Sequence, residues 1–201
     1  MAETPISFKS EALAIDGRLD MADANRGVVI THPHPLFGGD MNNPVVKSIK
    51  SVYQRKGYTT LRFNFRGVGR SEGRYDEGRG EKTDFVAAVA FLKDKGVQAI
   101  DLAGYSFGTW INAAAADAVS AHAMIMVSPP VGMLEFDKEA TFDTLKLVVT
   151  GSEDEFAPPR LVKPMVRDWN PDAALHVIDG ADHFFFSHLS ELEEILSAHL
   201  G

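Results

Sequence analysis

The sequence contains no cysteine among its 201 residues. A disulfide scaffold, a thiolate metal site and a cysteine nucleophile are therefore excluded. Cationic residues are also scarce: 20 lysines and arginines stand against 28 aspartates and glutamates, which gives a formal net charge of −8. Because phosphate binding needs clustered Lys and Arg, we expect no nucleic-acid partner.

Long apolar runs are missing as well. The longest uncharged stretch, residues 118–134, is interrupted by Pro129, Pro130 and Gly132 and falls short of a membrane span. Residues 1–10 show no basic region followed by an apolar one, so they do not resemble a secretory signal. Together with the lack of cysteine, this favours a cytoplasmic protein without a membrane span. The length favours a single domain over residues 1–201.

Short apolar or β-branched runs alternate with helix-length stretches along most of the chain. Strands are expected at residues 27–31, 59–63, 98–102, 123–127, 145–150 and 174–178, and helices at residues 45–56, 82–95, 109–118, 160–168 and 187–199. Two weaker runs, residues 5–9 and 12–21, suggest an N-terminal antiparallel hairpin. The alternation predicts an α/β fold with a mostly parallel sheet and helices on both faces. Residues 128–144 leave little room for a large lid.

The pentapeptide Gly104-Tyr105-Ser106-Phe107-Gly108 follows one of these strands and opens a helix. A sharp strand-to-helix turn of the form Gly-x-Ser-x-Gly is a nucleophile elbow, which presents the serine hydroxyl at the C-terminal edge of a parallel sheet. A Cβ at either glycine would collide with the neighbouring strand and helix. The pattern predicts that Ser106 is a nucleophile.

A serine hydroxyl needs a general base, and the base needs an acid that fixes its tautomer. The strand at 145–150 is followed by Gly-x-x-Asp154, with Glu153 and Glu155 as rival carboxylates. The strand at 174–178 is followed by a loop that contains His183. The expected catalytic residues are therefore Ser106, Asp154 and His183.

Acyl transfer also needs two backbone donors for the oxyanion. The Phe107 N–H, directly after the nucleophile, is the first by the geometry of the elbow. The second is expected in the loop after the strand that ends near His32. Pro33 and Pro35 have no N–H, which leaves His34, Leu36 and Phe37.

The whole arrangement resembles the α/β-hydrolase superfamily, whose catalytic residues run nucleophile, acid, histidine along the chain. Residues 32–43 (HPHPLFGGDMNN) and 61–71 (LRFNFRGVGRS) resemble small lid-less bacterial serine hydrolases related to dienelactone hydrolase. The resemblance implies an α/β-hydrolase fold, favours Asp154 over its neighbours, and makes Leu36 the preferred second oxyanion donor, with His34 the second choice.

We therefore expect a serine hydrolase that cleaves a carboxylic ester or thioester through an acyl-enzyme. The alternatives are an amide or peptide hydrolase with the same residues, or a non-catalytic ligand-binding module. The partner is a small-molecule ester or acyl substrate, and no cofactor is needed. His32 and His34 are not expected to bind metal, because prolines follow both and a third ligand is missing. The natural substrate and the oligomeric state stay open.

Three further expectations concern neighbouring side chains. Arg66 is expected to pair with a carboxylate such as Asp84 rather than to bind an anion. Residues 184–186 (FFF) can wall an acyl pocket, with one or two of the rings in the core. Met133 is expected to fill the core.

Overall fold

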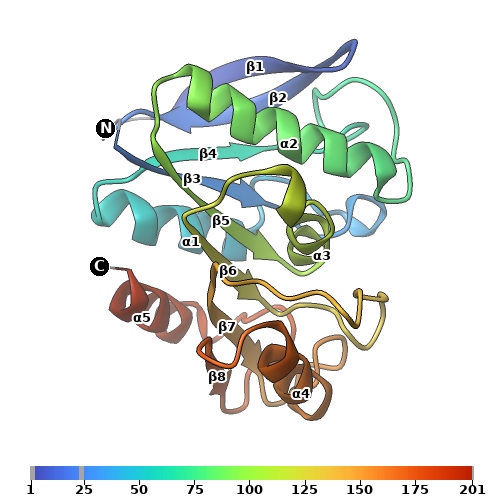
Figure 1. Cartoon of the computed structure of the whole chain (residues 1–201), viewed down its shortest axis with the longest axis vertical. Helices are drawn as coiled ribbons and strands as arrows, with labels where there is room; N and C mark the ends of the chain where they lie inside the picture. Colours follow the sequence, from blue (N-terminus) through green and yellow to red (C-terminus); the bar gives the residue numbers. More distant parts are fainter. Residues whose placement is uncertain (1–2, 23–24, 201) are drawn as a thin grey trace.

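The computed structural model describes residues 3–22 and 25–200. Met1 and Ala2, the start of the segment considered above as a signal sequence, lie outside the described residues. The model has one eight-stranded sheet in the order β1-β2-β4-β3-β5-β6-β7-β8 (Figure 1). The strands are β1 (Thr4–Ser10), β2 (Leu13–Asp20), β3 (Arg26–Thr31), β4 (Thr59–Phe63), β5 (Ala99–Tyr105), β6 (Ala123–Val127), β7 (Leu145–Gly151) and β8 (Ala174–Ile178).

Among the strands of the described residues, β2 alone runs against the others. β1 pairs antiparallel with β2, and β2 pairs antiparallel with β4. From β4 to β8 every pairing is parallel. The expected α/β-hydrolase fold with an N-terminal hairpin is confirmed, and the C-terminal ends of β3, β5, β6, β7 and β8 share one edge of the sheet.

Within residues 3–22 and 25–200, five α-helices cover the sheet: α1 (Pro44–Arg55), α2 (Arg79–Asp94), α3 (Phe107–Ala114), α4 (Pro159–Trp169) and α5 (Leu189–His199). α1 and α5 pack together on one face, and α2, α3 and α4 lie on the other (Figure 1). α1 starts where the sequence supplies a suitable signal. The Asn43 side chain accepts a hydrogen bond from the Val45 N–H, and Pro44 occupies the first helical position.

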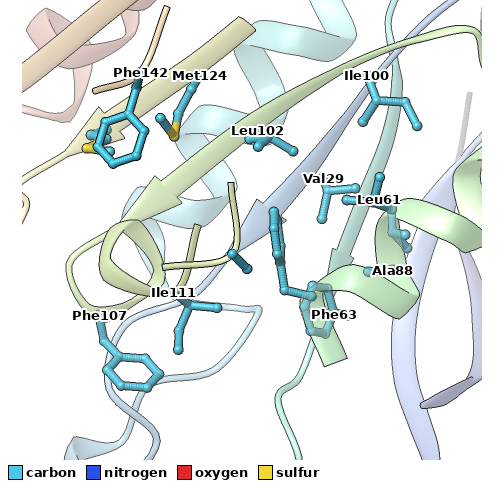
Figure 2. Close-up of a cluster of buried hydrophobic side chains, with 14 of the residues drawn as sticks. Val29, Leu61, Phe63, Ala88, Ile100, Leu102, Phe107, Ile111, Met124 and Phe142 are labelled. Atoms are coloured by element: carbon cyan, nitrogen blue, oxygen red, sulfur yellow. The ribbon is translucent and has the colours of Figure 1, made fainter. Parts of the chain in front are cut away.

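The core is divided by the sheet into two apolar layers. On the α2–α3–α4 face, Val29, Leu61 and Leu102 project from the strands toward the helices, where Ala88 of α2 and Ile111 of α3 meet them (Figure 2). All five are buried. The second layer lies between the sheet and α1 with α5. Burial on both faces explains why the central strands are continuously apolar rather than alternating.

At the nucleophile elbow, the observed ends of the strand and the helix differ from the expected ones. β5 extends to Tyr105, and α3 starts at Phe107 and ends at Ala114, after which a 3₁₀ turn (Ala116–Ala118) follows. Residues 128–144 connect β6 to β7 without a helix or strand, which confirms the absence of a lid. Within the described ranges, no helix is both long and apolar enough to span a membrane.

Candidate active site

Ser106 lies in the tight turn between β5 and α3. Its backbone angles are φ 53° and ψ −123°, in a region that a residue with a side chain rarely adopts. Two glycines allow the close packing that holds it there. A Cβ on Gly104 would lie 2.8 Å from the Thr109 backbone nitrogen, and one on Gly108 would lie 2.7 Å from the Thr31 carbonyl oxygen. The expected collisions with helix and strand are therefore present in the structure.

A continuous hydrogen-bond chain links the three residues expected to be catalytic. The His183 Nε2 lies 2.9 Å from the Ser106 Oγ, and the His183 Nδ1 lies 3.0 Å from each carboxylate oxygen of Asp154. The three residues come from the ends of β5, β7 and β8. Because parallel strands end at the same edge of the sheet, residues 77 and 29 positions apart in sequence meet there.

The Asp154 carboxylate is held by its own loop. Its Oδ1 accepts hydrogen bonds from the N–H groups of Phe156 (2.9 Å) and Ala157 (2.7 Å). Burial of this carboxylate opposes its ionisation, but the hydrogen bond and positive charge of His183 outweigh burial and keep the pKa of Asp154 below its usual range. The rivals Glu153 and Glu155 are exposed. Asp154 is thus the carboxylate that the structure brings to His183.

A shallow hollow of about 340 Å³ opens above Ser106 and His183. Both side chains are nearly covered, since Ser106 is 8% and His183 is 7% exposed. Aromatic and other apolar groups dominate the wall, and no Asp, Glu, Lys or Arg contributes to it. The lining residues are Pro33, His34, Phe37, Gly38, Gly39, Asn43, Tyr105, Ser106, Met133, Phe156, His183 and Phe184.

Two of the earlier expectations about the wall need correction or refinement. Met133 was expected in the core, but it is 50% exposed and lines the hollow, because residues 128–144 form an irregular loop over the sheet edge. Of the three consecutive phenylalanines, Phe185 is fully buried, Phe184 lines the hollow and Phe186 is 76% exposed. Phe156 also lines the hollow, and the sequence analysis did not predict this. Its position two residues after Asp154 is the sequence feature that could have indicated it.

The loop after β3 forms a single 3₁₀ turn, Pro35–Phe37. The Leu36 N–H donates to the His34 Nδ1 at 3.2 Å, so this N–H is engaged within its own turn. This geometry speaks against Leu36 as the second oxyanion donor. No acceptor for the His34 N–H is found among residues 3–22 and 25–200, and His34 lines the hollow.

The side chain of His34 is fixed by its neighbours. Since its Nδ1 accepts from Leu36, its Nε2 carries the proton in the neutral ring and donates to the Tyr75 hydroxyl, 3.2 Å away. The ring also packs 4.8 Å from that of Phe107 and 4.7 Å from that of Phe37, measured between centroids. Burial lowers the pKa of His34. The loop that approaches Ser106 is therefore built around a neutral histidine.

His32 has a structural place beneath this loop. Its Nε2 accepts a hydrogen bond from the Phe65 N–H (3.0 Å), so its Nδ1 donates to the Pro33 carbonyl (2.6 Å). Complete burial is the main cause that lowers its pKa to about 4. Both ring nitrogens thus bond backbone groups of two loops, one after β3 and one after β4.

The loop after β4 is anchored by an ion pair that the sequence suggested. The Arg66 guanidinium contacts the Asp84 carboxylate of α2 at 2.8 Å, and the Arg66 N–H donates to the same carboxylate at 2.9 Å. Asp84 is fully buried. The expected pairing of Arg66 with Asp84 is confirmed, and the arginine is directed into the fold rather than toward the hollow.

No protein-family model matches the chain. In solved structures, the chain superimposes on an α/β serine hydrolase homologue from Coxiella burnetii with a TM-score of 0.91 and 35% identity, over 100% of this chain and 99% of that one. A lid-less α/β serine hydrolase from Xanthomonas campestris gives a TM-score of 0.91 and 27% identity, over 99% and 94% of the two chains. The fold is therefore that of an α/β hydrolase.

A curated relative extends this likeness to sequence. An uncharacterized protein of Rickettsia prowazekii is 32% identical over an alignment of 211 positions, which spans 97% of this chain and 87% of that protein. The chain belongs to the α/β-hydrolase superfamily and is similar to its lid-less serine hydrolases. These likenesses support hydrolase activity. The expected relation to dienelactone hydrolase stays a prediction.

Proposed function

We propose that this protein is a serine hydrolase that cleaves a carboxylic ester or thioester through an acyl-enzyme. The observation that carries the proposal is the hydrogen-bond chain from Asp154 through His183 to Ser106 at the floor of an open apolar hollow. A strained serine next to a histidine base, with the histidine oriented by a carboxylate, is the arrangement that activates a hydroxyl at neutral pH.

In the first half of the reaction, the His183 Nε2 takes the proton of the Ser106 hydroxyl while the Oγ bonds to the substrate carbonyl carbon. The resulting imidazolium then gives this proton to the leaving alcohol or thiol as its bond to the carbonyl carbon breaks. In the second half, His183 deprotonates a water molecule that attacks the acyl-enzyme. The proton returns to the Ser106 Oγ as the acid is released.

Asp154 has two tasks in this scheme. It fixes the His183 tautomer with the proton on Nδ1, and its negative charge stabilises the imidazolium. The two N–H donors of Phe156 and Ala157 keep the carboxylate ionised and oriented. Because nucleophile, base and acid partner are all protein groups, the scheme uses no metal or organic cofactor.

The oxyanion donors we propose are the backbone N–H groups of Phe107 and His34. Phe107 is the first residue of α3, so its N–H has no partner within the helix. The His34 N–H is preferred over that of Leu36 because the latter already bonds the His34 ring. Loss of one such donor typically costs about 100-fold to 1000-fold in turnover.

An ester or thioester fits the site better than a peptide. Proteins that hold extended peptides commonly pair them with an exposed strand edge. Here Ser106 follows β5, which has β3 on one side and β6 on the other. The hollow thus opens above the middle of the sheet. Amide hydrolysis is nevertheless possible with the same residues, so matched ester and amide substrates should be compared directly.

The decisive experiment is labelling with a fluorophosphonate probe. The wild type should be labelled at Ser106, and the Ser106→Ala variant should not. A matched control is Ser10→Ala, since Ser10 is also a buried serine at the end of a strand but lies on β1, the first strand in the sheet order and far from β5. A folded wild-type protein that resists the probe would argue for a ligand-binding module instead.

A further inference from the structure

Most of the large apolar side chains that are exposed in the described part of the protein lie in the loops around Ser106. Among the described residues, they are Met21, Leu36, Phe37, Met133, Val177, Phe184 and Phe186. Phe37, Met133 and Phe184 line the hollow itself. Only Met21 and Val177 belong to other parts of the surface.

Leu36 and Phe186 extend the exposed apolar surface beyond the hollow. Leu36 precedes Phe37 in the same 3₁₀ turn. The Phe186 ring stacks on that of Phe184, with centroids 5.6 Å apart and planes inclined by 27°. Leu36, Phe37, Met133, Phe184 and Phe186 are called the apolar rim below. Monomeric proteins rarely collect exposed apolar side chains in one place unless that place binds something.

The rim is continuous with the reacting groups. The Phe184 ring lies 5.7 Å from the ring of His183 and 5.6 Å from the ring of Phe186, both measured between centroids. On the other side, Phe37 packs 4.7 Å from His34. An acyl chain that starts at the Ser106 Oγ can therefore pass from the hollow onto Phe184 and then Phe186 without crossing a polar surface.

The lack of Asp, Glu, Lys and Arg in the hollow also favours an uncharged acyl group. None of its lining residues is Asp, Glu, Lys or Arg, although these four types make up 24% of the chain. An ionised acyl group would lose its hydration there without gaining a counter-charge. An uncharged hydrocarbon chain loses nothing comparable and gains from every methylene group removed from water.

We propose that the acyl group of the substrate is an uncharged hydrocarbon chain long enough to leave the hollow and lie on Phe184 and Phe186. The chain length matters because Phe186 does not line the hollow and is reached only by a group that projects from its mouth. This inference rests on the proposed function and names the substrate class for the same site.

The test is a series of p-nitrophenyl esters from acetate to dodecanoate, kept below their aggregation limits. The value of kcat/KM should rise roughly twofold to fourfold per added methylene, the range expected for partial to full burial, until the chain passes Phe186. The p-nitrophenyl hemiester of succinate should be hydrolysed more slowly than the butanoate. A flat chain-length profile, or a preference for the succinate ester, would overturn the proposal.

Two surface variants test where the chain lies. Phe186→Ser should lower the ratio of kcat/KM for decanoate to that for acetate by about threefold to tenfold, which corresponds to the loss of one aromatic contact. Met21→Ser removes an exposed apolar side chain of the other surface and should leave that ratio unchanged. Equal ratios in both variants would overturn the role of Phe186. The proposal would also be overturned if size-exclusion chromatography showed a dimer for the wild type and a monomer for Phe186→Ser. The rim would then be covered by a second copy of the chain.

A binding measurement separates this inference from the proposed function. The Ser106→Ala variant should bind a ten-carbon methyl ketone at least tenfold more tightly than a four-carbon one. That result supports binding of the hydrocarbon chain on the apolar rim even if hydrolysis of esters is absent. Conversely, equal binding of the two ketones by a protein that hydrolyses esters through Ser106 would overturn this role of the apolar rim and leave the proposed function in place.

Discussion

The Tyr105 hydroxyl donates a hydrogen bond to the backbone carbonyl of His183 at 2.8 Å. The residue that precedes the proposed nucleophile thus holds the loop that carries the proposed base. The ring of Tyr105 also lies 5.5 Å from the ring of His183. Burial raises the pKa of Tyr105, which keeps its hydroxyl protonated as a donor. Tyr105 is a positioning residue in this interpretation.

Replacing Tyr105 with Phe should lower kcat about tenfold and change KM little. The variant keeps the ring but leaves the buried His183 carbonyl without its donor, so the imidazole loses its fixed position relative to the Ser106 Oγ. The same loss should reduce the free energy of unfolding by about 1 kcal/mol. Steady-state kinetics on an ester substrate measure the first effect, and urea unfolding measures the second.

Tyr58→Phe is the matched control. It also removes a hydroxyl from a buried tyrosine, but Tyr58 precedes β4 at the opposite edge of the sheet, where its hydroxyl lies near Arg26. This variant should keep wild-type kcat. Equal losses of kcat in the two variants would show that the effect is one of general stability.

Asp84→Asn should destabilise the fold strongly. It removes the negative charge that faces the Arg66 guanidinium at 2.8 Å in a buried site, and the exposed carboxylate of Glu11, 3.4 Å away, stays as the weaker partner. Breaking a buried ion pair from one side typically costs about 3–5 kcal/mol, and the remaining Glu11 contact favours the lower end, about 3 kcal/mol. Chemical denaturation followed by circular dichroism measures the change. Asp117→Asn, at an exposed carboxylate, should alter the free energy of unfolding by less than about 0.5 kcal/mol. Similar small losses in both variants would contradict the importance assigned to the buried pair.

Most of the fold and the three proposed catalytic residues could be predicted from the sequence. Buried parallel strands are continuous apolar runs, and helix starts such as Asn43-Pro44 are chemically marked, so the elements were predictable within a few residues. Ser106, Asp154 and His183 each follow a strand. Since the topology brings these strand ends to one edge, position along the chain was enough to place them together.

The details of the loops could not be obtained in this way. Which N–H of residues 34–37 is free depends on the His34 ring, which captures the Leu36 N–H. No periodic pattern records that bond. Similarly, three consecutive phenylalanines carry no sign of which one turns inward; Phe185 does so through a backbone with φ 55°. Met133 lies in a loop without periodicity, so its exposure was not predictable from its apolar character.

Gly108→Ala should damage the elbow. The added methyl carbon would lie 2.7 Å from the Thr31 carbonyl oxygen, so β3 or α3 must shift. Overpacking of this kind typically costs about 1–3 kcal/mol, and a shift of α3 would also move the Phe107 N–H. Activity and stability should therefore fall together, as measured by ester hydrolysis and thermal unfolding.

Gly96→Ala separates this effect from backbone strain. Gly96 has φ +90°, but no atom lies within 4 Å of an added Cβ. The variant should lose about 1 kcal/mol of stability from its left-handed backbone while its activity stays at the wild-type level. If Gly108→Ala behaved in the same way, the close packing of α3 against β3 would not be what positions Ser106.

The buried His32 should make the fold less stable in mild acid. Its pKa is about 4 in the folded protein, against 6.5 for the ordinary side chain, so the unfolded chain binds more protons between these values. The stabilisation is complete above pH 6.5 and decreases as the pH falls toward 4. Between pH 7 and pH 5 this single group should account for a loss of about 2 kcal/mol in the free energy of unfolding.

Urea unfolding at pH 7 and pH 5 can isolate this contribution. His32→Asn keeps a side chain that hydrogen-bonds but cannot be protonated in this range, so the difference between the two pH values should be smaller than in the wild type by about 2 kcal/mol. His176→Asn is the control, because the His176 side chain on β8 is half-buried whereas that of His32 is fully buried. An unchanged pH difference in His32→Asn would mean that the pKa of His32 is not lowered in the folded protein. The acid sensitivity would then have to come from other groups.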